Sequence, residues 1–163
     1  MRAPIRLALA AAVVIVSALA VAATAFADSA HFIRASASID SSGNLVCSFK
    51  EAGLGTTVST EHVSCSADAS ATYACINGGG NHPKAANKAT IAGPVSGDGD
   101  FPVRNGSTTG SITVAPPGPG DFSCPGGQRL VLASVSYSNI VLEGSAGDTA
   151  NVPGEVSRTL VDV

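Results

Sequence analysis

Apolar and polar residues alternate along much of this 163-residue chain, and this period of two constrains the fold more than any other feature. Successive side chains of a strand point to opposite faces of its sheet, so strict alternation predicts half-buried strands. The alternation is longest over residues 58–76, which predicts either one bent strand or two strands. One parity of this stretch is apolar and mostly small: Val63, Cys65, Ala67, Ala69, Ala71, Tyr73 and Cys75.

Shorter alternating or apolar runs predict further strands over residues 33–39, 45–50, 89–95, 100–103, 110–115 and 130–142. In the first run, Ile33, Ala35, Ala37 and Ile39 are expected to point inward. Turn residues separate the runs at 40–44, at 97–99 and at Asn105-Gly106. The most apolar run, 130–142, is expected in the interior of a sheet. Residues 144–163 are expected to form a loose tail in which 156–163 could add an edge strand.

Several short strands with turns between them, and no convincing helical period, are typical of an all-β protein. We therefore predict an antiparallel β-sandwich with an immunoglobulin-like topology. A small barrel is the alternative, and the buried Trp of immunoglobulin domains is missing because the chain has no Trp. The predicted sandwich is a single domain over residues 28–143.

The N-terminal segment has the features of a secretory signal peptide. Arg2 and Arg6 precede an uncharged apolar run over 7–23, and Ala25-Phe26-Ala27 provides small residues for cleavage after Ala27. An uncleaved membrane anchor is the alternative, but the apolar run is shorter than the roughly 20 residues that span a bilayer. We expect a secreted, extracellular protein with no membrane attachment after cleavage.

The charge pattern excludes some classes of partner. The formal net charge is −3, and removing Arg2 and Arg6 makes it more negative. The remaining basic residues are scattered, which argues against nucleic acid and anionic membranes as partners. Nothing in the sequence indicates a cofactor or a metal site. The ligand is expected to be an unidentified extracellular molecule, and the protein is assumed to be a monomer.

Four cysteines in an exported chain predict two disulfides. No pair has the C-x-x-C spacing that is typical of a zinc site. Four cysteines allow three pairings. Cys47 and Cys65 are symmetric about Thr56 and have the inward parity of their runs. A hairpin closed at this loop would place the two opposite each other, so the sequence favours a Cys47–Cys65 bond.

Two segments carry a resemblance to known proteins. They are TYACINGGGNHPKAANK over residues 72–88 and PPGPGDFSCPGGQ over 116–128. With the run 130–137, they resemble a group of small secreted actinobacterial proteins, over roughly residues 46–142. That group has no assigned activity, but the resemblance implies a bond between Cys75 and Cys124, because each segment carries one. In outline the chain is also similar to the apoproteins of enediyne chromoproteins and to subtilisin inhibitors, although it has no motif of either.

A Cys75–Cys124 bond would join residues 77–87 and 116–127, which we call the tied loops, at one end of the sandwich. Loops held by a rigid scaffold often carry binding sites. The candidate polar contacts are Asn77, Asn81, His82, Lys84 and Asn87, and the candidate apolar contacts are Pro117, Pro119 and Phe122. The alternative is that the bond only stabilises two long loops.

Catalysis is less favoured by the sequence. No G-x-S-x-G motif accompanies His31, His62 and His82. His62 has the outward parity of its strand and is expected at the surface. Asp98-Gly99-Asp100 is interpreted as a turn rather than a calcium site, since a full calcium loop is missing. The predicted function is therefore a non-catalytic extracellular binding module. A protease inhibitor or a small-molecule carrier is the alternative, and a hydrolase is less favoured.

Overall fold

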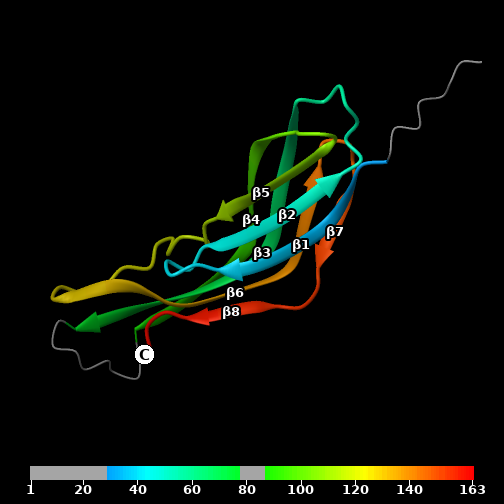
Figure 1. Ribbon diagram of the computed structural model, residues 1–163. Coiled ribbons are helices and arrows are strands. Elements are labelled where there is room, and N and C mark those ends of the chain that lie inside the picture. The colour runs from blue at the N-terminus through cyan, green and yellow to red at the C-terminus, as the bar shows by residue number, and fades with distance from the viewer. Residues whose placement is uncertain (1–28, 78–86) are drawn as a thin grey trace, which may run out of the picture.

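The computed structural model describes residues 29–77 and 87–163, which form two antiparallel sheets packed face to face (Figure 1). This part of the chain contains strands and turns but no helix. One sheet has the order β1-β2-β5, and the other has the order β4-β3-β6-β7 with β8 also paired to β6. The strands are β1 (His31–Ile39), β2 (Leu45–Ala52), β3 (Thr60–Asn77), β4 (Lys88–Pro102), β5 (Ser107–Val114), β6 (Gln128–Gly144), β7 (Thr149–Val152) and β8 (Val156–Thr159).

This arrangement confirms the predicted antiparallel β-sandwich with two disulfides. The immunoglobulin-like topology stays a prediction, because the strands divide into sheets of three and five rather than the four and three of a constant-type domain. The core lies between the sheets and consists mostly of Ala, Val, Ile, Leu and half-cystine side chains. Phe49 and Tyr137 are the largest of its fully buried side chains.

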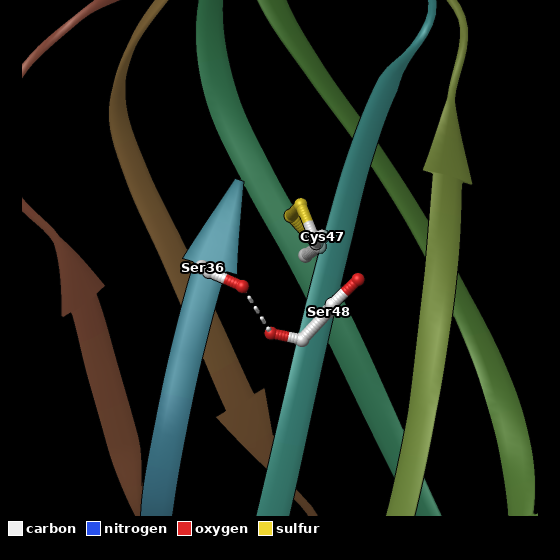
Figure 2. The surroundings of a disulfide bond; sticks show 4 residues. Ser36, Cys47 and Ser48 are labelled. Atoms are coloured by element: carbon white, nitrogen blue, oxygen red, sulfur yellow. Dashed lines mark hydrogen bonds between the residues drawn. A yellow bond between two sulfur atoms is a disulfide. The ribbon is translucent and has the colours of Figure 1, made fainter. Parts of the chain in front are cut away.

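The disulfide between Cys47 and Cys65 is confirmed, but the hairpin that predicted it is wrong. β2 pairs with β1 and β5, whereas β3 pairs with β4 and β6, so the bond crosses from one sheet to the other. Figure 2 shows Cys47 directing its sulfur from β2 toward the β3 ribbon. The two Cα atoms lie 6.5 Å apart, closer than the roughly 10 Å that usually separates packed sheets.

Glycine on the neighbouring strand β4 favours this close approach of the sheets. Gly97 lies opposite Cys65 in the β3–β4 ladder, and a Cβ there would lie 3.3 Å from the side chain of Val114 in the other sheet. The predicted turn at 97–99 is therefore wrong, because residues 88–102 form one continuous strand at the edge of the larger sheet. The glycines at 97 and 99 face inward, where they leave space for apolar side chains.

The long alternating run is a single strand, which confirms the bent-strand interpretation over the two-strand one. β3 extends over 18 residues with partners on both sides. Its pairing with β6 shifts register between Ser66 and Asp68 and again between Thr72 and Tyr73. Such irregularities increase local twist, which helps so long a strand to remain paired.

The prediction that Ile33 points inward from the first strand is wrong. The β1–β2 register shifts between Phe32 and Arg34, and this bulge turns Ile33 outward, where 56% of it is exposed. Phe32 packs against the core instead. From Ala35 onward the predicted alternation holds.

The C-terminal segment belongs to the sheet more fully than the predicted loose tail. β7 pairs with residues 140–143 of β6, and β8 pairs with residues 134–137 of the same strand. β8 covers part of the range expected to add an edge strand. β6 is therefore an interior strand, as its apolar sequence predicts.

The predicted turn at 40–44 is present and is fastened to the core by a tyrosine. Asp40 accepts hydrogen bonds from the backbone nitrogens of Ser42 and Asn44, and Gly43 has φ of 88°. The hydroxyl of buried Tyr137 donates a 2.7 Å hydrogen bond to the Gly43 carbonyl. This bond joins β6 of one sheet to the turn that follows β1 in the other.

Replacing this hydroxyl should destabilise the protein measurably. Tyr137→Phe leaves a buried carbonyl without its donor, and we expect a loss of about 1–3 kcal/mol in the free energy of unfolding. Urea unfolding of the variant measures it. Tyr73→Phe is the matched control. Its expected loss is smaller, because the hydrogen bond from the Tyr73 hydroxyl to the Pro117 carbonyl is only partly buried. Equal midpoints for wild type and Tyr137→Phe would contradict this role.

Candidate functional site

The second disulfide lies at one end of the sandwich and joins the tied loops. Cys75, near the end of β3, bonds to Cys124 in the segment before β6, and their Cα atoms are 5.5 Å apart. This confirms the pairing that the resemblance implied. In Figure 1 the end of β3 and the start of β6 lie together at the lower left, away from the start of β1. The bond therefore fixes the segment around Cys124 to the end of β3, from which the first loop departs.

Hydrogen bonds position the described parts of the tied loops. The Tyr73 hydroxyl donates to the Pro117 carbonyl at 2.8 Å, which holds the proline-rich segment over the end of β3. The backbone nitrogen of Cys75 donates to the Asn87 carbonyl, and the Asn87 amide donates to Gln128 Oε1 at 3.4 Å. The proline-rich segment and the two described ends of the first loop are therefore held by covalent and polar contacts.

The predicted site residues divide into three groups. Asn77 and Asn87 are exposed at the strand ends that flank the first loop, as a binding role requires. Pro117 is half-buried, and Phe122 packs against the core, so Phe122 contributes more to the fold than its predicted ligand contact implies. Asn81, His82 and Lys84 lie outside the described residues, and their role stays a prediction.

The C-terminal end of the chain lies beside the tied loops. Lys88, directly after Asn87, donates a 2.6 Å hydrogen bond from its ammonium group to the Val163 carbonyl oxygen. Gln128, which accepts from Asn87, begins β6. Residues from three distant parts of the sequence therefore meet at this end of the sandwich.

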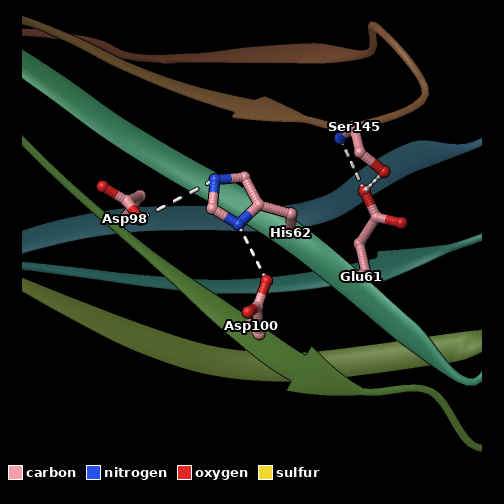
Figure 3. Close-up of polar contacts among 5 residues, drawn as sticks. All are labelled: Glu61, His62, Asp98, Asp100 and Ser145. Carbon is pink, nitrogen blue, oxygen red and sulfur yellow. Dashed lines mark hydrogen bonds and ion pairs between the residues drawn. The ribbon is translucent and has the colours of Figure 1, made fainter.

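A second polar cluster surrounds His62 on the outer face of the larger sheet (Figure 3). His62 is exposed, as predicted, and its Nδ1 lies 2.8 Å from Asp100 Oδ1 while its Nε2 lies 3.8 Å from Asp98 Oδ2. The hydrogen bond to Asp100 raises the pKa of His62 above its ordinary value. The carboxylates flank opposite sides of the ring rather than converging on one point.

This geometry gives no support to the hydrolase alternative. A triad needs a nucleophile on the second histidine nitrogen, but His62 Nε2 faces Asp98 instead. Ser145, although nearby, donates from its hydroxyl to Glu61 Oε1 at 2.7 Å (Figure 3). Over 29–77 and 87–163, no three His, Cys, Asp or Glu residues are arranged to hold a metal ion.

Surface hollows of moderate size lie on the sandwich. One of about 350 Å³ is lined by His62, Ser64, Glu143, Gly144, Ser145 and Gly147. Another of about 200 Å³ on the same sheet is lined mainly by hydroxyl side chains of β3, β6 and β8. A third, of about 400 Å³, lies beside Ile39 and Val156 and has a more apolar lining, so the carrier alternative stays a prediction.

Sequence reasoning missed three carboxyl groups at the end of the sandwich opposite the tied loops. We call Glu51, Glu61 and Asp148 the acid junction. Glu51 has no exposed surface and Glu61 is 2% exposed. The signal was present in the sequence, because Glu51 shares the parity of Cys47 and Phe49, and Glu61 shares the parity of Val63 and Cys65. An acid at an inward position of a strand marks a site that needs a partner.

Comparisons with known proteins identify no relative. No family model matches the chain, and no curated protein or solved structure resembles it significantly. The resemblance to small secreted actinobacterial proteins therefore stays a prediction. No helix in the described residues is long and apolar enough to cross a membrane.

Proposed function

We propose that this chain is a secreted, non-catalytic β-sandwich module that binds an extracellular polymer through the tied loops. The observation that carries this proposal is the Cys75–Cys124 disulfide, which joins the end of β3, where the first loop begins, to the proline-rich segment before β6. Rigid fixation lowers the entropy that loops lose when they bind a ligand. The signal-like N-terminus and the two disulfides support secretion.

The amide side chains described at this end favour a ligand with polar, uncharged groups. Asn77 and Asn87 are exposed amides, and Gln128 lies beside them. Each amide offers both donors and acceptors, which matches the hydroxyl and acetamido groups of a glycan. We therefore infer that the ligand is a wall polymer rich in such groups.

Co-sedimentation tests this proposal directly. The secreted protein is mixed with insoluble peptidoglycan, chitin or cellulose, and the bound fraction is measured after centrifugation. We expect the double variant Asn77→Ala and Asn87→Ala to bind at least about tenfold more weakly than wild type, because two ligand hydrogen bonds are lost.

Asn151→Ala is the matched control for this experiment. Asn151 is an exposed amide on β7, whose partner residues in β6 are far along that strand from Gln128. The control variant should bind like wild type. Equal binding by the double variant, or no binding of wild type to any of the three polymers, would contradict the proposal.

One observation favours a protease inhibitor as the second candidate. The segment before β6 is rich in proline, is anchored at Cys124 and presents exposed residues at Gly118, Gly120 and Asp121. A rigid, disulfide-anchored loop is suited to occupy a protease cleft without being released after cleavage. Slow, tight inhibition of a secreted serine protease by the purified protein would favour this candidate over polymer binding.

A further inference from the structure

The acid junction lies where the two sheets meet, at the end opposite the tied loops. Glu51 is on β2 of the smaller sheet, while Glu61 is on β3 and Asp148 is in the turn between β6 and β7 of the larger one. Gly144, the last residue of β6, provides the space. A Cβ at Gly144 would lie 2.6 Å from Asp148 Oδ1 and 3.2 Å from Glu51 Oε1.

Two of these carboxyl groups lack partners. In the described part of the chain, no other residue donates a hydrogen bond to either oxygen of Glu51 or Asp148, and all four oxygens are buried. Glu61 differs, because the nitrogen and hydroxyl of Ser145 donate to its Oε1 at 2.6 and 2.7 Å. A buried, unpaired carboxylate is unstable, and two adjacent ones also repel each other.

The charged and polar surroundings do not neutralise the pair. On β1, the charge of His31 lowers the pKa of Asp148, but this is the smallest influence on that group, and the exposed ring directs its Nδ1 toward the Ser29 carbonyl. Phe32 lies opposite Glu51. On β5, Thr108 pairs with Glu51 but its hydroxyl donates to the Pro102 carbonyl. On β3, Glu61 adds negative charge. A bound proton is the smallest change that satisfies this site.

We propose that Glu51 and Asp148 share a single proton across the junction between the two sheets, and that losing this proton loosens this end of the sandwich. Glu51 holds the proton and donates its O–H to an Asp148 oxygen, so that the pair carries one negative charge instead of two. The contact then joins the sheets as a hydrogen-bonded clasp. Above the pH at which the proton leaves, two buried carboxylates face each other and the clasp opens.

The direction of the titration supports this clasp. Burial and the neighbouring acids raise the pKa of Glu51 to about 7, and burial also raises the pKa of Asp148. An unfolded chain releases its proton near the ordinary Glu value of 4.5. Between these values the folded protein holds a proton that the unfolded chain has lost, so stability is greatest at acid pH and falls as pH rises toward 7.

Thermal unfolding of the wild-type protein and of three variants, Glu51→Gln, Glu143→Gln and His62→Gln, tests the proposal. Wild type should lose roughly 10 °C in Tm between pH 5 and pH 8. Glu51→Gln provides a permanent donor to Asp148, so it should match wild type at pH 5 and exceed its Tm by several degrees at pH 8. Glu143→Gln, at an exposed position of β6, is the matched control and should keep the wild-type dependence.

His62 requires a control of its own because its raised pKa also favours stability at lower pH. His62→Gln removes the exposed contacts with Asp98 and Asp100 and should leave most of the Tm change in place. If His62→Gln abolishes the change and Glu51→Gln does not, the clasp is wrong.

A direct measurement keeps the proposal falsifiable if Glu51→Gln does not fold. The side-chain carboxyl carbon of Glu51 in the wild-type protein is followed by ¹³C NMR against pH. The clasp requires a midpoint near 7, and a midpoint in the ordinary carboxyl range would overturn it. A rise in wild-type Tm at pH 8 on adding calcium chloride, lost in Glu51→Gln, would also overturn it by assigning the junction to a metal ion.

Discussion

Replacing both Cys47 and Cys65 by alanine is expected to lower the free energy of unfolding by about 3–5 kcal/mol, a large share of a typical domain stability. The chain-entropy model assigns roughly 3 kcal/mol to a closed loop of this length, and the sequence separation is 18 residues. Both cysteines are fully buried, so alanine also leaves a void between the sheets. The surrounding structure relaxes only partly around such a void.

Urea unfolding with the second disulfide intact measures this loss. The matched comparison is Cys75→Ala with Cys124→Ala, which opens a loop of greater length but leaves the bond between the sheets in place. This comparison variant should keep the folded core and lose order in the tied loops. A Cys47→Ala and Cys65→Ala protein with the wild-type midpoint would show that packing alone holds the sheets together.

Phe49→Ala is expected to have an effect of similar size, about 3–5 kcal/mol. Phe49 is 1% exposed, and its ring meets Phe32 and Phe101 edge to face at centroid distances of 5.9 and 4.9 Å. The chain has only five Phe and no Trp, so this group is its main cluster of large side chains. Removing the central ring takes away contacts from both neighbours.

Denaturant unfolding monitored by circular dichroism measures the Phe49 effect. Phe122→Ala is the control, because Phe122 is a half-buried ring on the same core and should cost less. A Phe49→Ala loss below about 1 kcal/mol would contradict the central place of this ring in the core.

Strands could be predicted from the sequence where one face of the strand is buried and the other is exposed to solvent. β3 alternates over most of its length, β2 alternates less regularly and β6 stands out as an apolar run, and each is predicted close to its observed place. Pairing between strands was harder, because alternation reports a buried face but not the partner. The Cys47–Cys65 bond is therefore predicted correctly from a wrong argument. Two inward-pointing residues on facing sheets can lie as close together as two residues opposite each other in a hairpin.

Glycine caused the clearest error in the predicted strands. Gly97 and Gly99 in a short sequence with aspartate have the composition of a turn, yet both lie in a ladder opposite β3. Their role is to leave space for side chains of the other sheet and for the ring of Phe101, which is visible only once the sheets are packed. Gly110 is required for the same reason, because a Cβ at that position would collide with the ring of Phe101.

The two ends of the sandwich differ in how much of each the sequence predicted. The tied loops were found because their cysteines and prolines are local signals, and the Asn77 and Asn87 positions follow from them. The acid junction was missed because it combines β2, β3 and the β6–β7 turn. Only the parity of Glu51 and Glu61 could have indicated it, and no local pattern brings Asp148 to them.

The position of β4 at the rim of the larger sheet has a consequence for how molecules behave at high concentration. A long strand with an unpaired side can recruit the same strand of another molecule and begin aggregation. Pro94 lacks a backbone donor in the middle of β4, and the charged side chains of Asp98 and Asp100 project beside it. These residues make the rim a poor template for a second copy, so they disfavour fibre growth from this edge at high protein concentration.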